Sequence, residues 1–340
     1  MRTNQPVIIS LMVISLLLTG CSRSEAPDLL EFSGQTMGTW YSVKVVDLPE
    51  PVSPRQVADV IQGELDNVNQ KMSTYRPDSE LSRLNAAPVA EPFAVSRETF
   101  TVLSKALEIW RLSQGAFDIS IGPLVNLWGF GPEGRPREVP DDAAMRAAWK
   151  RVGSDRLELH VDDREVVKET DLYLDLSAIA KGFAVDQVAL ALEGLGIRQY
   201  LVEVGGEIRA GNSKGPDQPW RLAVEEPVTQ FRQIHQVIPL ANAAMATSGD
   251  YRNYFEADGQ RYSHTIDPRD GRPIRHRLAS VSVIMPSCMA ADAWATALMV
   301  LGPEQGMALA ESQNLAVYMI LKTDAGFESM HSSGFRPFLE

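Results

Sequence analysis

The chain has 340 residues, with 44 acidic side chains against 32 lysines and arginines, a formal net charge of −12 and two cysteines. Such an acidic surface repels nucleic acid and anionic lipid, which excludes a nucleic-acid-binding function. A polyphosphate ligand would need a compensating cation, and a divalent metal ion bridges carboxylates and phosphate oxygens most economically.

The first thirty residues predict export and a lipid anchor. An uncharged apolar run over residues 6–18 is too short to span a bilayer and ends in Leu18-Thr19-Gly20-Cys21. A cysteine directly after small residues is typical of a lipoprotein signal peptide, and the alternative is an ordinary signal peptide or anchor with a chance cysteine. We expect a signal peptide at 1–20, a lipid on Cys21, a tether at 21–30 and a single domain at 31–340.

This reading predicts an exported lipoprotein, anchored in a membrane through Cys21 and facing the periplasm. Cys288 is then the only other cysteine of the mature chain, so an intrachain disulfide is not available. A domain of this length can bury a core large enough to fold without one.

The first half of the chain mixes short strands with helices. In chain order, the spacing of apolar and turn-forming residues predicts a strand at 40–46, helices at 55–72, 79–85 and from Ser96 to Gly115, a loop at 129–140, a helix at 141–150 and a strand at 156–161.

Three motifs in this half contain residues suited to a flat ligand. Met37, between two glycines, offers a polarizable surface or is simply a buried turn residue. Tyr75, in the loop after the first helix, can stack on an aromatic ligand or be an ordinary exposed tyrosine. Asp118, in Gly115-Ala116-Phe117-Asp118, can accept hydrogen bonds from a ring imide or a ribose, or form an Asx turn.

Strands outnumber helices in the second half, and several are joined by short turns such as Asp258-Gly259. We therefore predict an α+β fold with mixed, largely antiparallel sheets covered by helices. In chain order, we expect strands at 171–176, 199–204, 219–225, 235–240, 251–256, 261–266, 279–285 and 315–322, with helices at 178–194, 287–301 and 303–312.

Residues 171–186 pass from a period-two apolar run into a helix whose start carries Asp175, Ser177, Lys181 and Gly182. Unpaired backbone N–H groups and the helix dipole make such a junction a site for phosphate. The alternative is an ordinary strand-to-helix junction with Ser177 as N-cap.

Two further motifs suggest catalysis and metal binding. His264, at the end of a predicted strand, suits a general base, although a lone strand histidine is often structural. Asp292 and Thr296 lie four residues apart, hence on one helix face, and carboxylate plus hydroxyl oxygens suit Mg²⁺. The alternative for this pair is a helix-terminal charge with a threonine bonded to its own helix.

Taken in order, these motifs resemble the ApbE family, the FAD:protein FMN transferases. The resemblance runs from about Gly34 to Leu321. Its motifs are Thr36-Met37-Gly38-Thr39, Met72-Ser73-Thr74-Tyr75, Gly115-Ala116-Phe117-Asp118, Asp175 to Gly182, Val204-Gly205-Gly206-Glu207, Ser248-Gly249-Asp250-Tyr251, Ser263-His264-Thr265-Ile266-Asp267-Pro268 and Ala291-Asp292-Ala293.

The resemblance implies the T-fold-related flavin transferase fold and an enzyme that uses Mg²⁺ to move the FMN half of FAD onto a threonine or serine hydroxyl of an acceptor protein, releasing AMP. The implied FAD-binding residues are Met37, Tyr75, Ala116, Phe117, Asp118, Asp175, Lys181 and Ile266. The implied metal ligands are the backbone carbonyl of Ala178 and the side chains of Asp292 and Thr296. His264 is the implied catalytic residue, as a base or as a group that orients the phosphate. Some relatives carry a second acid directly before that threonine, whereas this chain has Ala295.

The implied acceptors are proteins of the Rnf or sodium-pumping NADH:quinone reductase type. Two alternatives stay open on the sequence. One is an FAD pyrophosphatase that gives FMN and AMP, and the other is a non-catalytic flavin-binding lipoprotein.

Overall fold

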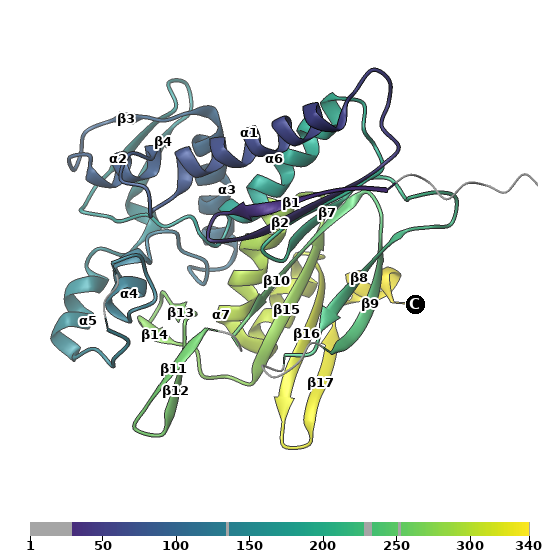
Figure 1. The fold of residues 1–340 in the computed structure, drawn as a ribbon. Coiled ribbons are helices and arrows are strands. Elements are labelled where there is room, and N and C mark those ends of the chain that lie inside the picture. Colours follow the sequence, from purple (N-terminus) through teal and green to yellow (C-terminus); the bar gives the residue numbers. More distant parts are fainter. Residues whose placement is uncertain (1–28, 134–135, 228–232, 251–252, 340) are drawn as a thin grey trace, which may run out of the picture.

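An eight-stranded sheet forms the centre of the fold (Figure 1). The computed structural model describes residues 29–133, 136–227, 233–250 and 253–339. The strand order is β1-β2-β6-β7-β10-β15-β16-β17, and each neighbouring pair is antiparallel. The strands are β1 (Leu29–Thr36), β2 (Thr39–Val46), β6 (Tyr200–Val204), β7 (Glu207–Ala210), β10 (Ala243–Gly249), β15 (Leu278–Met285), β16 (Ala316–Thr323) and β17 (Gly326–His331).

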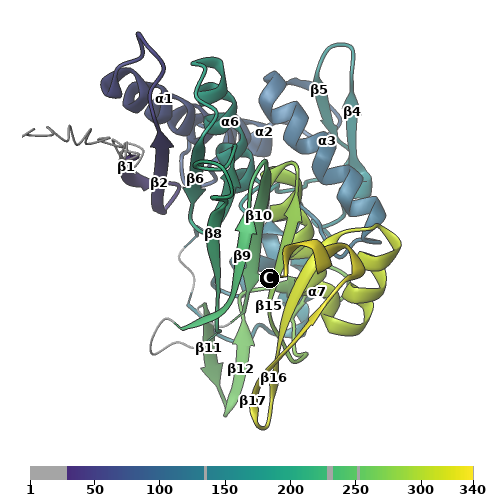
Figure 2. The same cartoon turned by 90° about the vertical axis from the view of Figure 1, so that its right-hand side faces the viewer.

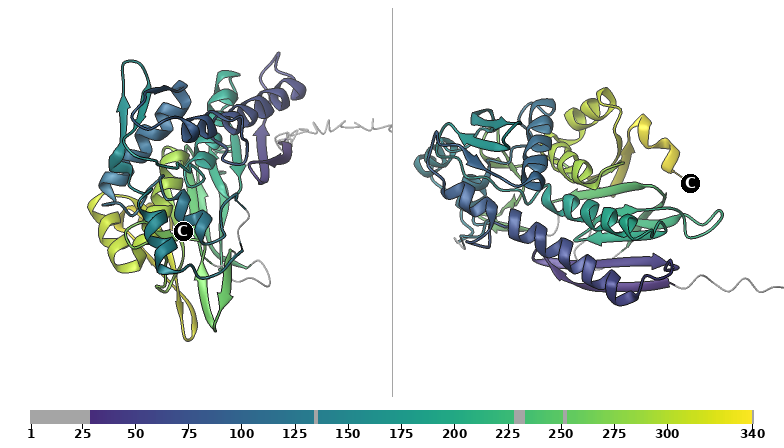
Figure 3. Two further views of the ribbon diagram at one scale, coloured as in Figure 1. Left: turned by 90° about the vertical axis from the view of Figure 1, so that its left-hand side faces the viewer. Right: turned by 90° about the horizontal axis from the view of Figure 1, so that it is seen from above.

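Three long helices cover one face of this sheet: α1 (Pro54–Met72), α6 (Ala180–Gly194) and α7 (Cys288–Ser312) (Figures 1 and 3). Alternate strand side chains, such as Val43, Val202 and Val281, are buried beneath them in one large hydrophobic core. Period-two alternation in the strands and helical spacing in α1 bring these apolar side chains together. The α+β fold with antiparallel sheets is therefore confirmed.

A hairpin of β8 (Trp220–Glu225) and β9 (Ile234–Leu240) packs on the opposite face, together with the 3-10 helix η2 (Ser333–Phe338) (Figure 2). Ile238 and Phe335 join outward-facing strand residues in a second core there. Seven of the eight residues of β15 are consequently buried, since the strand is covered on both faces.

Smaller elements complete one end of the molecule. They are α2 (Glu80–Ala86), β3 (Phe93–Ala94), α3 (Arg97–Leu112), α4 (Gly122–Leu127), α5 (Asp142–Trp149), the 3-10 helix η1 (Ser154–Arg156), β4 (Leu157–His160), β5 (Glu165–Lys168), β11 (Tyr254–Ala257), β12 (Gln260–Ser263), β13 (Ile266–Asp267) and β14 (Arg272–Pro273). The Asp258-Gly259 turn joins β11 to β12 as expected.

Most predicted helices are confirmed, and three of them begin at a serine N-cap. Ser53, Ser79 and Ser96 are the N-caps of α1, α2 and α3, and each side chain accepts a hydrogen bond from a backbone N–H in the first turn. The predicted boundary between helices 287–301 and 303–312 falls inside α7 at Gly302, whose φ of 76° is left-handed, and Pro303 follows it. The α7 axis is therefore interrupted at this point.

The strand predicted at 171–176 is wrong, because the segment pairs with no other strand in the part of the chain that the structure describes. The side-chain amide of Asn85 replaces a partner strand: its Nδ2 donates to the Leu174 carbonyl at 2.9 Å and its Oδ1 accepts from the Leu174 N–H at 2.7 Å. Ser177 is also not the N-cap of α6, because that position falls at Ile179 and the Ser177 N–H instead donates to Asp175 Oδ1.

Several strands were not predicted, among them β1, β5, β7, β10 and β17. The alanine-rich β10 has no clear apolar–polar alternation in its sequence and a low propensity for strand structure. Its pairing with β7 and β15 stabilises it as a strand. Helix α4 was also missed.

The fold begins two residues earlier than the predicted domain. Leu29 and Leu30, assigned to the tether, pair with Val46 and Val45 in the sheet. Cys21, the predicted signal peptide and the rest of the tether lie outside the described residues, as do two residues of the strand predicted at 251–256. Within the described ranges, every helix is too short or too polar to cross a bilayer.

Candidate functional site

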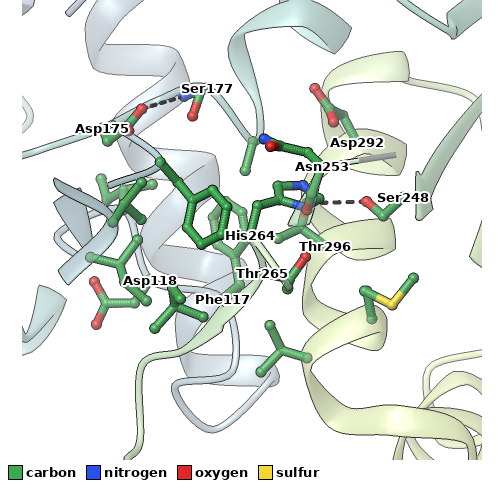
Figure 4. Close-up of a pocket in the computed structure, with 18 of the residues that line it drawn as sticks. Phe117, Asp118, Asp175, Ser177, Ser248, Asn253, His264, Thr265, Asp292 and Thr296 are labelled. Atoms are coloured by element: carbon green, nitrogen blue, oxygen red, sulfur yellow. Dashed lines mark hydrogen bonds between the residues drawn. The ribbon is translucent and has the colours of Figure 1, made fainter. Parts of the chain in front are cut away.

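A cavity of about 460 Å³ lies where α6, α7, β7 and β10 meet the loops of the smaller elements (Figure 4). It brings together residues that are far apart in the sequence. The predicted site residues that line it are Tyr75, Ala116, Phe117, Asp118, Asp175, Ala178, Lys181, His264, Ile266, Asp292 and Thr296. Met37 is not among the lining residues and lies in the turn between β1 and β2, with a left-handed φ of 48°.

The close approach of α6 to α7 fixes one side of the cavity. The Gly182 N–H, in the first turn of α6, donates to Asp292 Oδ2 at 3.0 Å. Gly182 is the third residue of α6, so its N–H has no acceptor within the helix, and Asp292 caps α6 from a different helix. Position 182 must be glycine, because a Cβ there would lie 2.3 Å from the Cys288 carbonyl oxygen.

Lys181 reaches between two buried carboxylates at this junction. Its Nζ lies 3.0 Å from Glu207 Oε1 and 3.6 Å from Asp292 Oδ1. The second oxygen of Glu207, Oε2, is buried and has no hydrogen-bond partner among the described residues. Two carboxylates against one ammonium leave the cluster short of positive charge when all three are ionised.

These contacts shift the ionisation of all three groups. Burial raises the pKa of Glu207 to about 8, although the Lys181 ammonium opposes the rise. Burial also raises the pKa of Asp292, again against the effect of Lys181. For Lys181, burial lowers the pKa, but the two carboxylates more than offset it and hold the pKa above its ordinary value. The cluster therefore takes up a proton at neutral pH, and a further cation can supply that positive charge instead.

Thr296 lies one turn beyond Asp292 on the same face of α7. Its Oγ1 is 3.3 Å from the Ser248 hydroxyl of β10. The Thr296 hydroxyl thus has a hydrogen-bond partner outside α7. No group of three or more histidine, cysteine, aspartate or glutamate side chains in the described residues is arranged to hold a metal ion. A metal site in this cavity would therefore need main-chain and hydroxyl oxygens as ligands in addition to the Asp292 carboxylate. We call Lys181, Glu207, Asp292 and Thr296 the charged wall of the cavity.

His264 lies between β12 and β13 with its ring facing the cavity (Figure 4). Its Nδ1 is 3.0 Å from the Asn253 carbonyl oxygen. A carbonyl only accepts hydrogen bonds, so Nδ1 carries the proton of the neutral ring and Nε2 keeps a free lone pair. Burial lowers the pKa of His264 below its usual value, which favours this neutral form.

The opposite side of the cavity comes from loops, and both oxygens of its Asp118 carboxylate are already bonded. Asp118 Oδ1 accepts from the N–H and the hydroxyl of Ser120 and from the hydroxyl of Ser154, and Oδ2 accepts from the Ser154 N–H. The Asx turn that the sequence left open therefore exists. Asp175 makes a second one with Ser177.

Tyr75 is 73% exposed, as a stacking residue at an entrance can be. Phe117, by contrast, is buried in the main core while it lines the cavity. We call Tyr75, Phe117, Asp118, Asp175 and Ile266 the loop wall.

Sequence reasoning missed several lining residues, of which Glu207 matters most. It ends the motif Val204-Gly205-Gly206-Glu207 but was not among the predicted site residues. A glutamate directly after a glycine pair and a buried strand was the available signal, since it places a carboxylate at a sharp turn. Asn253, which orients His264, and Phe130, whose ring meets the His264 ring edge-on at 6.3 Å, had no such signal.

Comparison with known proteins gives consistent results. The FAD:protein FMN transferase of Vibrio cholerae is 48% identical over 325 residues, 95% of this chain and 96% of the relative. The protein of the same name from Escherichia coli is 37% identical over 340 residues, 97% of each chain.

Solved structures agree in fold over most of the chain. The flavin transferase ApbE from Vibrio cholerae matches with a TM-score of 0.86 at 47% identity, covering 92% of this chain and 100% of that one. The apo form of Pseudomonas stutzeri flavinyl transferase ApbE matches at 0.85 and 38% identity, covering 92% and 97%. A model of the ApbE family matches residues 37–319. The chain therefore belongs to the ApbE family.

Proposed function

We propose that this protein is an FAD:protein FMN transferase, which moves the FMN half of FAD onto a threonine or serine hydroxyl of an acceptor protein and releases AMP. The carrying observation is the meeting of the charged wall with His264 in one cavity, in a chain whose relatives bear that name. A cation held by the carboxylates would offset the charge of a diphosphate, and the neutral histidine beside it could take a proton from an attacking hydroxyl.

The residues present fit a Mg²⁺ ion. Asp292 and Thr296 would hold it from α7 and the Ala178 carbonyl from the start of α6, which gives the hard oxygen ligands that Mg²⁺ prefers. The unpaired Glu207 Oε2 and the excess of carboxylate support a cation here. Bound there, Mg²⁺ would neutralise charge on the diphosphate. Ala295 is fully buried in the core, so it offers nothing to a second ion.

His264 is suited to take the proton of the attacking hydroxyl. Its Nδ1 faces the Asn253 carbonyl, so Nε2 is the basic nitrogen. The hydroxyl oxygen forms a bond to the phosphorus of the FMN half, the anhydride bond to AMP breaks, and the hydroxyl proton passes to Nε2. Lys181 would offset the charge that collects on the departing AMP. The product is a phosphoester of the acceptor side chain.

The loop wall would bind and orient FAD. Tyr75 and Phe117 offer aromatic surface, Ile266 and Ala116 offer apolar contact, and Asp175 lies beside the start of α6. Asp118 acts on the ligand through the loop it holds, because its oxygens already accept bonds from Ser120 and Ser154. The role of Met37 rests on the family resemblance alone.

The direct test is to incubate the purified protein with FAD, Mg²⁺ and a threonine-bearing acceptor domain of the Rnf or sodium-pumping NADH:quinone reductase type. The acceptor should gain the mass of one FMN residue while AMP is released, and omission of Mg²⁺ should prevent both. AMP and free FMN with no gain in acceptor mass, for every such domain tried, would instead indicate an FAD pyrophosphatase. Bound FAD that stays intact would indicate a flavin-binding lipoprotein.

We also propose that the protein is lipidated on Cys21 and anchored with its cavity facing the periplasm. The support is the sequence Leu18-Thr19-Gly20-Cys21 after an apolar run. Labelled palmitate should enter the wild-type protein and not a Cys21→Ala variant, which should leave the membrane fraction. Equal labelling of both proteins would contradict the anchor.

A further inference from the structure

Lys181 is shared unequally between its two carboxylate neighbours. It lies at hydrogen-bonding distance from Glu207 Oε1, 3.0 Å, and at the longer distance of 3.6 Å from Asp292 Oδ1. Both carboxylates are nearly inaccessible, with side chains 5% and 4% exposed. Lys181 is thus the positive charge that stabilises Asp292 in the absence of a metal ion.

Asp292 has little freedom to turn away from this contact. Its Oδ2 is fixed by the Gly182 N–H at 3.0 Å, and its backbone lies inside α7. The oxygen left to face a cation is Oδ1, the same atom that Lys181 approaches. An ammonium and a divalent ion at one carboxylate oxygen repel each other strongly in a buried setting. One of the two cations must withdraw.

Glu207 offers Lys181 a place to withdraw to. Its Oε1 already accepts from the Lys181 ammonium, and its buried Oε2 has no partner within the described part of the chain. A lysine ammonium has three N–H donors, so it can bond to both oxygens of one carboxylate. This move would satisfy the one orphaned acceptor of the cluster and release Asp292 Oδ1.

We propose that Lys181 is an exchangeable counter-ion, which neutralises Asp292 in the metal-free protein and moves from Asp292 to Glu207 when a divalent ion binds, with its third N–H left to face the diphosphate. Glu207 is then a positioning residue that acts through Lys181, and not a metal ligand. The inference rests on the metal site of the proposed function. It adds that metal binding and the Lys181–Asp292 contact exclude each other.

A double-mutant cycle of Mn²⁺ affinity tests this, measured by calorimetry on FAD-free protein. Lys181→Met should raise the Mn²⁺ affinity at least about tenfold, because the competing charge is gone. Glu207→Gln should lower it about fivefold or more in the wild-type background, since Lys181 then stays on Asp292. In the Lys181→Met background, Glu207→Gln should change the affinity by less than about twofold.

Two results would overturn the proposal. If Glu207 binds the metal directly, Glu207→Gln will cost as much in the Lys181→Met background as in the wild type. If Lys181 does not compete, Lys181→Met will leave the affinity unchanged or lower it. Lys181→Gln repeats the test with a polar side chain should the methionine variant unfold, and thermal unfolding in the presence of EDTA checks each variant.

Two controls separate this inference from the metal site itself. Lys71→Met removes a comparable lysine in the last turn of α1, 20% exposed and 2.9 Å from Glu98, and should leave Mn²⁺ affinity unchanged. Asp292→Asn should abolish binding. If Asp292→Asn has no effect, the proposed metal site is wrong. If it abolishes binding while Lys181→Met changes nothing, only the exchange is wrong.

Discussion

Asp118 on the loop wall and Asp292 on the charged wall use their carboxylates in opposite ways. On the loop wall, Asp118 accepts four hydrogen bonds from Ser120 and Ser154 and is saturated. On the charged wall, Asp292 accepts one backbone N–H and shares one lysine with Glu207, whose Oε2 has no partner in the described structure. The oxygens of a structural carboxylate are saturated with hydrogen bonds from the protein, whereas those of a ligand-binding carboxylate are not.

The same contrast exists a few residues away on α6. Asp186 is buried like Asp292, but it accepts from the N–H groups of Cys288 and Met289, from the Ser287 hydroxyl and from Arg209. It caps α7, just as Asp292 caps α6. Of these two acids that join the helices, only Asp292 lines the cavity. Burial alone therefore does not separate structural from functional acids, but the count of satisfied oxygens does.

The largest effect is expected at Asp292. Asp292→Asn keeps an acceptor for the Gly182 N–H but removes the charge that a metal ion requires, so the rate of AMP release should fall by about a thousandfold or more. The thermal unfolding temperature should change little by comparison. A steady-state assay of AMP release over a Mg²⁺ titration measures this, and near-normal turnover would contradict the role of the charged wall.

His264→Ala should lower kcat about a hundredfold, with a much smaller change in KM for FAD, because a general base acts in the chemical step. Burial, Arg137 and Lys181 lower the pKa of His264, while Asp250 and the Asn253 carbonyl oppose them. Activity should thus persist below pH 6.5 and fall only as the ring protonates through this lowered pKa. The variant should lack that acidic limb, and equal losses in kcat and FAD affinity would make His264 a binding residue.

Asp118→Asn should chiefly reduce stability. The introduced NH₂ group would either face the Ser154 N–H or displace the three donors on Oδ1, and leaving a buried donor unpaired costs about 2 kcal/mol. Urea denaturation measures the loss. Turnover at saturating FAD should stay within about tenfold of the wild type. A loss of turnover as large as that of Asp292→Asn would erase the distinction between the walls.

The smallest effect is expected at Tyr75, which is 73% exposed. Tyr75→Ala should raise KM for FAD by up to about tenfold through lost stacking, with kcat and stability unchanged. Tyr75→Phe should restore the wild-type KM. Initial rates over an FAD titration test this, and a kcat effect in the alanine variant would place Tyr75 in the chemical step.

The sequence predicted the helices well because their signals are local. Ser53, Ser79 and Ser96 cap helices within three residues of the hydrogen bonds they accept. Strands such as β10 were missed because their stability comes from neighbours far along the chain. The strand predicted at 171–176 was wrong for the same reason. Its alternating apolar pattern is local, but its hydrogen-bond partner is the side chain of Asn85, some ninety residues earlier.

The site shows the same division. Asp292, Thr296 and His264 were found from spacing and motif, and the fold does bring them to one cavity. The pairing of Lys181 with Glu207 and the cross-helix bond from Gly182 to Asp292 could not be predicted, since they depend on how α6, α7 and β7 meet.

The most direct measurement is a single-turnover mass analysis of the acceptor domain with FAD, Mg²⁺ and either the Asp292→Asn or the Asp118→Asn protein, each at saturating FAD. Our account predicts that Asp118→Asn adds one FMN residue to the acceptor and releases AMP, whereas Asp292→Asn binds FAD and adds nothing. Transfer by Asp292→Asn at the wild-type rate, or its loss in Asp118→Asn alone, would contradict the account.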